Sequence, residues 1–285
     1  MIRRRHYGVG EYPKGAACDG DTLWVVNTNS SSVSRLAVKD GRLIGSYTVG
    51  YGPQNAVFDG ENLWVTNAAD DTVSKLAARD GRAVATYPVG PRPWGLAFDG
   101  ANVWVTTAAN GSVSKLAARD GRLLGNYPVG AYPMGLAFDG SHIWVASYGG
   151  STVTKLRARD GAAVGVFRVD GPSDLVSDGA CIWVTHAARD RLARLRLQDG
   201  RLLGTYTVGN GPWGLAFDGR SIWVANHLDN SVSELDAEHG HLIGTYAVGR
   251  GPHHVAFDGC SIWVTNGGED SVTKLERRQE GGLRL

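Results

Sequence analysis

A tryptophan recurs along this chain at an almost constant interval, and no other feature restricts the possible folds as much. Each copy follows an aliphatic residue and precedes a valine: Trp24, Trp64, Trp104, Trp144, Trp183, Trp223 and Trp263. Five of the six intervals are 40 residues long and one is 39. A strict internal period of this length indicates a repeat architecture in which every repeat is one supersecondary unit.

One repeat, residues 211–250, contains four short apolar or alternating segments: 215–217, 222–225, 231–235 and 242–249. Asp218-Gly219 and His239-Gly240 lie between segments and are typical of tight turns. No helical periodicity extends over 11 residues. Four strands per repeat of about 40 residues are typical of a propeller blade. We therefore predict an all-β, seven-bladed β-propeller of four-stranded antiparallel blades, with residues 1–285 as a single domain.

The two ends of the chain predict how the ring closes. Tyr7-Gly8-Val9-Gly10 matches Tyr47-Thr48-Val49-Gly50, the fourth segment of the next repeat, and both tyrosines precede an Asp-Gly turn by 12 residues. The last repeat ends after its third segment, 271–275. We expect residues 3–9 to form the outermost strand of the last blade, because this pairing removes two exposed sheet edges.

Composition excludes several classes of protein. The 29 basic and 28 acidic residues nearly balance, which disfavours a nucleic-acid partner. Apolar runs are too short for a membrane span. Residues 1–8 are basic without a following apolar stretch, so no secretory signal is predicted and we expect a cytoplasmic protein. A processed secreted protein would look the same. We also expect a monomer. Cys18, Cys181 and Cys260 are too few and too far apart for a disulfide framework.

The repeats differ most where a loop proline introduces the first strand of each blade. The residue after this proline is in turn Lys14, Gln54, Trp94, Met134, Ser173, Trp213 and His253. At the next position Asn55, Asp174 and His254 replace the glycine of the other four repeats, and His227 lies in a loop at the same end. Packing demands are the same in every blade, so drift on exposed loops and a ligand site are the two explanations for this variation.

We predict a ligand site at this end, the top mouth of the central channel. Its candidate residues are Lys14, Gln54, Trp94, Met134, Trp213, His227, His253 and His254. Histidines near Asp174 and Asp190 could form a metal site, but no local spacing motif supports it, and separate surface imidazoles are the preferred interpretation. No metal ligand and no cofactor are therefore predicted.

The repeats resemble the YVTN/NHL class of β-propeller repeats. The resemblance rests on Trp-Val-Thr-Asn at 64–67 and 263–266 and on the proline loop before each first strand, and it covers essentially the whole chain. Within that class, the seven-bladed streptogramin (virginiamycin B) lyases also begin with an isolated outer strand and carry similar proline loops. The resemblance implies the fold and does not select a function.

A comparison with the lyase family, one residue at a time, gives one match in four. The family's catalytic histidine follows the loop proline of the last blade, where this chain has Pro252-His253. The acid before that proline is replaced by Gly251, the second histidine by Trp213 and a tyrosine of the first blade by Lys14. The resemblance therefore implies the same pocket location without implying the same reaction. A divalent metal such as magnesium would enter only under the lyase interpretation.

Three functions remain open. The leading one is a binding or interaction module that takes a small molecule or peptide at the top mouth. The second is a lyase or cyclase that uses His253 and its neighbours. The third is an engineered or recently amplified scaffold without an evolved ligand, which the identical segments 73–82 and 113–122 suggest.

Overall fold

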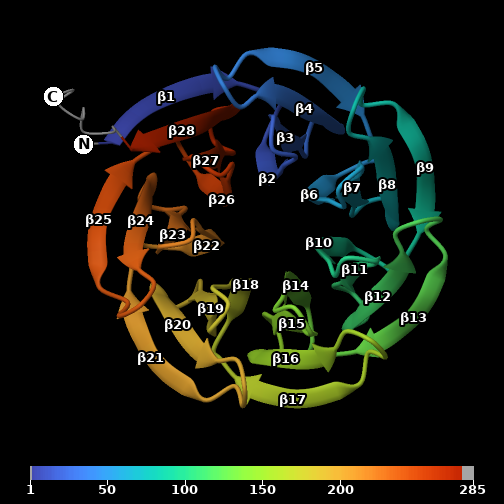
Figure 1. Ribbon diagram of the computed structural model, residues 1–285, viewed down its shortest axis with the longest axis vertical. Coiled ribbons are helices and arrows are strands. Elements are labelled where there is room, and N and C mark those ends of the chain that lie inside the picture. The colour runs from blue at the N-terminus through green and yellow to red at the C-terminus, as the bar shows by residue number, and fades with distance from the viewer. Residues whose placement is uncertain (1, 278–285) are drawn as a thin grey trace, which may run out of the picture.

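The computed structural model describes residues 2–277, and in this range the chain forms a closed ring of seven four-stranded antiparallel sheets (Figure 1). This confirms the predicted seven-bladed β-propeller. Blades 1 to 6 are β2–β5, β6–β9, β10–β13, β14–β17, β18–β21 and β22–β25, and blade 7 combines β26–β28 with β1. No helix among residues 2–277 has the length and apolarity needed to span a membrane.

In blades 1 to 6 the four strands follow chain order from the channel to the periphery, and in blade 7 β26–β28 do so while β1 is outermost. The first strands are β2 (Pro13–Cys18), β6 (Pro53–Phe58), β10 (Pro93–Phe98), β14 (Pro133–Phe138), β18 (Pro172–Ser177), β22 (Pro212–Phe217) and β26 (Pro252–Phe257). The second strands are β3 (Thr22–Asn27), β7 (Asn62–Asn67), β11 (Asn102–Thr107), β15 (His142–Ser147), β19 (Cys181–His186), β23 (Ser221–Asn226) and β27 (Ser261–Asn266). The third strands are β4 (Ser32–Ala37), β8 (Thr72–Ala77), β12 (Ser112–Ala117), β16 (Thr152–Arg157), β20 (Arg191–Arg196), β24 (Ser231–Asp236) and β28 (Ser271–Arg277). The outermost strands are β1 (Ile2–Gly8), β5 (Leu43–Thr48), β9 (Ala83–Pro88), β13 (Leu123–Pro128), β17 (Ala163–Arg168), β21 (Leu202–Thr207) and β25 (Leu242–Ala247).

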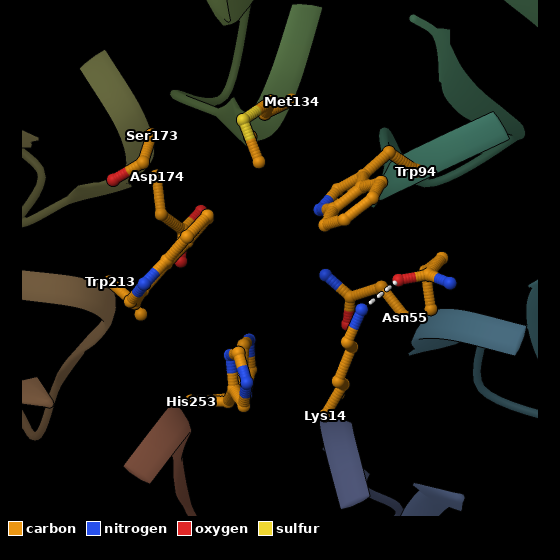
Figure 2. A pocket seen from close by; sticks show the side chains of 13 residues that line it. Lys14, Asn55, Trp94, Met134, Ser173, Asp174, Trp213 and His253 are labelled. Atoms are coloured by element: carbon orange, nitrogen blue, oxygen red, sulfur yellow. Dashed lines mark hydrogen bonds between the residues drawn. The ribbon is translucent and has the colours of Figure 1, made fainter. Parts of the chain in front are cut away.

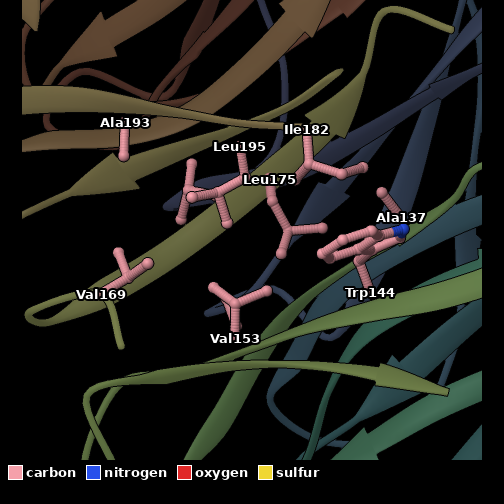
Figure 3. Close-up of a cluster of buried hydrophobic side chains, with 10 residues drawn as sticks. Ala137, Trp144, Val153, Val169, Leu175, Ile182, Ala193 and Leu195 are labelled. Carbon is pink, nitrogen blue, oxygen red and sulfur yellow. The ribbon is translucent and has the colours of Figure 1, made fainter. Parts of the chain in front are cut away.

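The repeated tryptophans are the centres of the hydrophobic clusters between blades, and all seven are at most 1% exposed. Figure 3 shows one such cluster, in which Trp144 and Val153 of blade 4 pack against Leu175 and Ile182 of blade 5. Each indole nitrogen donates a hydrogen bond of 2.6–2.9 Å to the aspartate of its own Asp-Gly turn, five residues earlier. The Asp-Gly motif therefore satisfies the polar atom of the buried tryptophan as well as forming a turn.

A second conserved contact links neighbouring blades. In six blades a lysine or arginine of the third strand lies over its own blade's tryptophan and donates to a main-chain carbonyl of the following blade. Blade 6 has Glu234 at this position, and Glu234 is 4% exposed. Arg277 of β28 forms an ion pair with Glu234 and lies over Trp223. The junction between blades 6 and 7 therefore uses an ion pair between the buried Glu234 and the exposed Arg277, where the other junctions use a cation and a carbonyl.

The ring closes as the sequence predicts. β1 pairs with β28 along its whole length, and Tyr7 lies opposite Val272. The Tyr7 ring lies 5.7 Å from the Trp263 ring, the same contact that Tyr47 makes with Trp24 in blade 1 at 5.5 Å. Tyr7 also covers Gly41 of blade 1, where a Cβ atom would lie 2.2 Å from the ring and φ is +76°. Glycine is required there by both the backbone angle and the close approach.

Removal of residues 1–8 should lower the melting temperature by more than about 5 °C, because it exposes the edge of β28 and uncovers Trp263. Circular dichroism melts of the full and shortened chains measure this effect. A synthetic peptide of residues 1–10, added in excess, should restore part of the loss by pairing with β28. An unchanged melting temperature would show that the ring does not depend on this closure.

Candidate functional site

A β-bulge in every first strand determines which side chains reach the channel. In blade 3, Pro93 pairs with Thr107 and Leu96 pairs with Val105, so β10 has one residue more than β11 over this stretch. The same shift follows the loop proline in the other six blades. Because a bulge redirects side chains that would otherwise alternate, both residues after the proline can face the channel.

These residues surround a cavity of about 50 Å³. Its wall includes seven of the eight residues predicted from the sequence: Lys14, Gln54, Trp94, Met134, Trp213, His253 and His254. The eighth, His227, does not line the cavity, and its ring centroid lies 4.6 Å from that of His253. His227 lies in a loop of blade 6, and its Nδ1 atom is 3.2 Å from the Pro252 carbonyl oxygen of blade 7. Figure 2 shows Lys14 and Trp94 on one side of the cavity and Trp213 on the other.

The cavity also contains residues outside the predicted set. Asn55, Ser173 and Asp174 line it, together with Gly15, Gly135 and Gly214. The sequence did distinguish Asn55 and Asp174, since each replaces a glycine of other repeats. The bulge that turns this position toward the channel is not visible in the sequence. We call the end of the channel lined by all these residues the mouth.

Crowding at the channel axis explains why four blades have glycine as the second residue after the loop proline. A Cβ atom on Gly95 would lie 2.1 Å from the Met134 carbonyl oxygen, and one on Gly214 would lie 2.6 Å from that of His253. Asn55, Asp174 and His254 are each followed, in the next blade around the ring, by a glycine at the same position. The three side chains therefore occupy positions where the neighbouring blade carries no side chain.

Lys14 is held by three groups, none of which carries a negative charge. Its Nζ atom donates to Gln54 Oε1 at 2.8 Å and lies 4.9 Å from the Trp94 ring centroid and 5.4 Å from that of Tyr12. Within residues 2–277 it forms no ion pair. Burial lowers the pKa of the ammonium group. The lysine thus brings a fixed but uncompensated positive charge to the mouth.

His253 is a neutral imidazole at physiological pH. Burial, together with the smaller effects of the nearby His227, Lys14 and His254, lowers its pKa to about 3. Its Nε2 atom lies 3.3 Å from the Tyr12 hydroxyl, and its ring lies 5.9 Å from that of Trp213. The imidazole can therefore exchange hydrogen bonds with a ligand without adding a charge.

Asp174 and His254 are the most strongly desolvated titratable groups of the mouth. Burial raises the pKa of Asp174 to about 7, although its carboxylate accepts backbone hydrogen bonds from Leu175 and Leu215 that act in the opposite direction. Burial lowers the pKa of His254 to about 4, and its Nδ1 atom has no hydrogen-bond partner among the described residues. Such groups cost stability, and buried groups of this kind are enriched at functional sites.

The residues of the mouth do not fit a divalent metal. Within residues 2–277 no group of three or more His, Cys, Asp or Glu side chains is placed to hold a metal ion. Asp174 is the single carboxylate in the cavity wall, whereas magnesium and calcium take several oxygen ligands. We therefore derive no metal-dependent step.

Comparisons with known proteins support the fold. No protein-family model matches the chain, so the YVTN/NHL repeat type is not confirmed, and no curated protein matches it. Among solved structures, a streptogramin B lyase superposes with a TM-score of 0.84 at 16% identity and covers 96% of this chain and 97% of its own. Hydrazine synthase of Kuenenia stuttgartiensis superposes with a TM-score of 0.80 at 20% identity, covering 93% and 96%. At these identities the likeness establishes the architecture, and the chain is a seven-bladed β-propeller structurally similar to both proteins.

Proposed function

We propose that this protein is a binding or interaction module whose ligand site is the mouth. The observation that carries the proposal is the variation among seven equivalent positions. They hold six residue types, although every blade meets the same packing demands. An amplified scaffold without a ligand would be expected to keep a uniform ring, as it keeps the identical segments 73–82 and 113–122.

The composition of the mouth favours a small molecule or the end of a peptide. Trp94, Trp213 and Met134 offer aromatic and thioether surface, whereas Lys14 and His253 offer directional polar contacts. A cavity of about 50 Å³ accepts a small chemical group and not a whole drug-sized molecule. The remainder of a ligand would therefore lie against the indoles at the rim.

A lyase or cyclase reaction is the second candidate, and Asp174 is the observation that favours it. Its pKa of about 7 is suited to proton transfer near neutral pH. His253, the residue that matches the lyase family, has a pKa of about 3 and would be a weak general base. The chemistry of the mouth thus supports binding more directly than catalysis by His253.

Fluorine NMR of protein labelled with 5-fluorotryptophan tests the proposed site. Seven of the nine tryptophans are buried in the core and two, Trp94 and Trp213, line the cavity, so the two mouth signals can be assigned with Trp94→Phe and Trp213→Phe. A screen of small organic fragments should yield compounds that shift these two signals and leave the seven core signals unchanged. If no fragment shifts them, or if hits shift core signals alone, the proposed site is wrong.

Among mouth variants, Trp213→Ala should weaken fragment binding more than His253→Ala does. The indole offers a larger contact area than the imidazole, and aromatic residues are enriched among residues that dominate binding energy. Dissociation constants from the same NMR titrations, followed through Trp94, measure both effects. A larger loss for His253→Ala, combined with turnover that this variant abolishes at unchanged melting temperature, would favour the lyase candidate instead.

A further inference from the structure

We propose that the mouth recognises an organic carboxylate, whose carboxylate group is bound by Lys14 and Asn55. This inference rests on the proposed function, because it names the chemical class of ligand for the same site. It follows from the distribution of donors and charges around the cavity.

Two donors, the Lys14 ammonium and the Asn55 side-chain amide, lie on the wall formed by blades 1 and 2. Lys14 uses one of its three N–H groups for Gln54, and the other two remain for a ligand. In the adjoining blade, Asn55 accepts the Ala56 N–H with Oδ1, which directs its Nδ2 amide donor away from that contact. In Figure 2 the Lys14 and Asn55 side chains extend from neighbouring strands toward the same part of the cavity.

The wall formed by blades 1 and 2 is preorganised to bind an anion. The Lys14 ammonium lies near the rings of both Tyr12 and Trp94 and has no charged partner among the described residues, while Gln54, which binds it, itself donates to the Gly52 carbonyl at 2.8 Å. A partly buried cation without an anionic partner is unfavourable, and a bound carboxylate would supply that partner. Because the lysine is already ordered, little side-chain entropy would be lost on binding.

The charge and surface of the mouth select a monoanion with an apolar body. Lys14 is the single lysine or arginine in the cavity wall, and Asp174, its single carboxylate, lies across the cavity from Lys14 (Figure 2). At most one negative charge of a ligand is therefore neutralised, whereas a phosphate dianion would leave excess charge. Trp213 and Met134 on the rest of the wall provide apolar surface that a small inorganic anion would not use. An aryl or alkyl carboxylate satisfies both conditions.

Phenylacetate and phenylacetamide form a matched pair for the test, since they differ in charge and hardly in shape. Titrations monitored by the Trp94 and Trp213 fluorine signals should show that phenylacetate binds at least about ten-fold more tightly. Lys14→Met removes the charge and keeps most of the unbranched side chain. In this variant the affinity for phenylacetate should fall to the affinity for phenylacetamide. Trp213→Ala, the control, should weaken the binding of both compounds and preserve the ratio of their dissociation constants.

The outcomes separate this inference from the proposed function. Equal affinity of the two compounds, or a difference that persists in Lys14→Met, would overturn the carboxylate assignment and leave the mouth as a binding site. Failure of both compounds to shift the mouth signals, while other fragments do shift them, would also overturn the carboxylate assignment alone. Failure of every compound would overturn both.

Discussion

Replacement of Trp144 by alanine is expected to lower the free energy of unfolding by about 3–5 kcal/mol. The indole is fully buried, its nitrogen donates to Asp139 at 2.8 Å, and it packs 5.6 Å from the Phe167 ring and 4.9 Å from the Lys155 ammonium. The substitution creates a cavity between blades 4 and 5 and removes one of the hydrogen-bond donors to the largely buried Asp139 carboxylate.

Trp213→Ala is the matched control, because it removes the same side chain from the mouth. Trp213 is partly exposed and its ring contacts that of His253 at 5.9 Å, so the expected loss is about 1 kcal/mol or less. Urea unfolding of both variants, followed by circular dichroism, measures the difference. Equal losses would mean that the division between core and mouth tryptophans is wrong.

Asp174→Asn should stabilise the protein at pH 8 and have almost no effect at pH 4. The pKa of Asp174 rises from an ordinary 3.8 to about 7 on folding, so the folded chain holds this proton more tightly than the unfolded chain. The free energy of unfolding therefore falls as pH rises from about 4 to about 7 and stays low above pH 7. Since one pKa unit corresponds to about 1.4 kcal/mol, the cost is about 4 kcal/mol at most, and screening by water in the channel reduces it.

The chain itself shows that asparagine fits this position. Asn55 occupies the equivalent place in blade 2 and accepts the following N–H at 2.8 Å, as Asp174 does at 2.9 Å. We expect a gain of roughly 1–3 kcal/mol at pH 8. His253 and His254 also make stability depend on pH in this range, because their pKa values in the folded chain lie below the ordinary 6.5. The wild type and the variant both contain them, so subtracting the two pH profiles isolates Asp174. A gain of equal size at pH 4, or a loss at pH 8, would contradict the burial of an uncompensated carboxyl.

Such a stabilising substitution would itself bear on function. A residue that costs stability, and whose equivalent in another blade is a neutral isostere, persists most readily where activity requires it. Asp174→Asn should therefore be compared with the wild type in the binding titrations as well as in unfolding. The stability gain and the change in binding are independent readouts of the same side chain.

The fold was predictable because its signals are local and repeated. The 40-residue tryptophan period, the Asp-Gly turns and the match of Tyr7 to Tyr47 all lie within short segments, and each repeat independently supports the others. The partner of Glu234 was not predictable in the same way. Arg277 lies 43 residues away along the chain and belongs to the next blade, so no short segment contains both residues.

The candidates came mostly from the first residue after each loop proline, and at the second residue only His254 was a candidate. Variation after each loop proline identified Lys14, Trp94, Trp213 and His253, because a strand that begins at the channel must present this residue near the rim. Asn55 and Asp174 depend on the β-bulge, which appears only in the strand pairing. The pKa shifts of the mouth residues arise from desolvation. All seven blades together bury these residues, so no single repeat of the sequence reveals the shifts.

A crystal structure of the protein soaked with phenylacetate tests the central claim most directly. The account predicts density in the mouth, with the carboxylate near Lys14 and Asn55 and the phenyl ring against Trp94 or Trp213. Crystals of the Lys14→Met variant, soaked at the same phenylacetate concentration, should lack that density. Density on the turns at the opposite end of the channel or on the outermost strands, with the mouth left empty, would contradict the account.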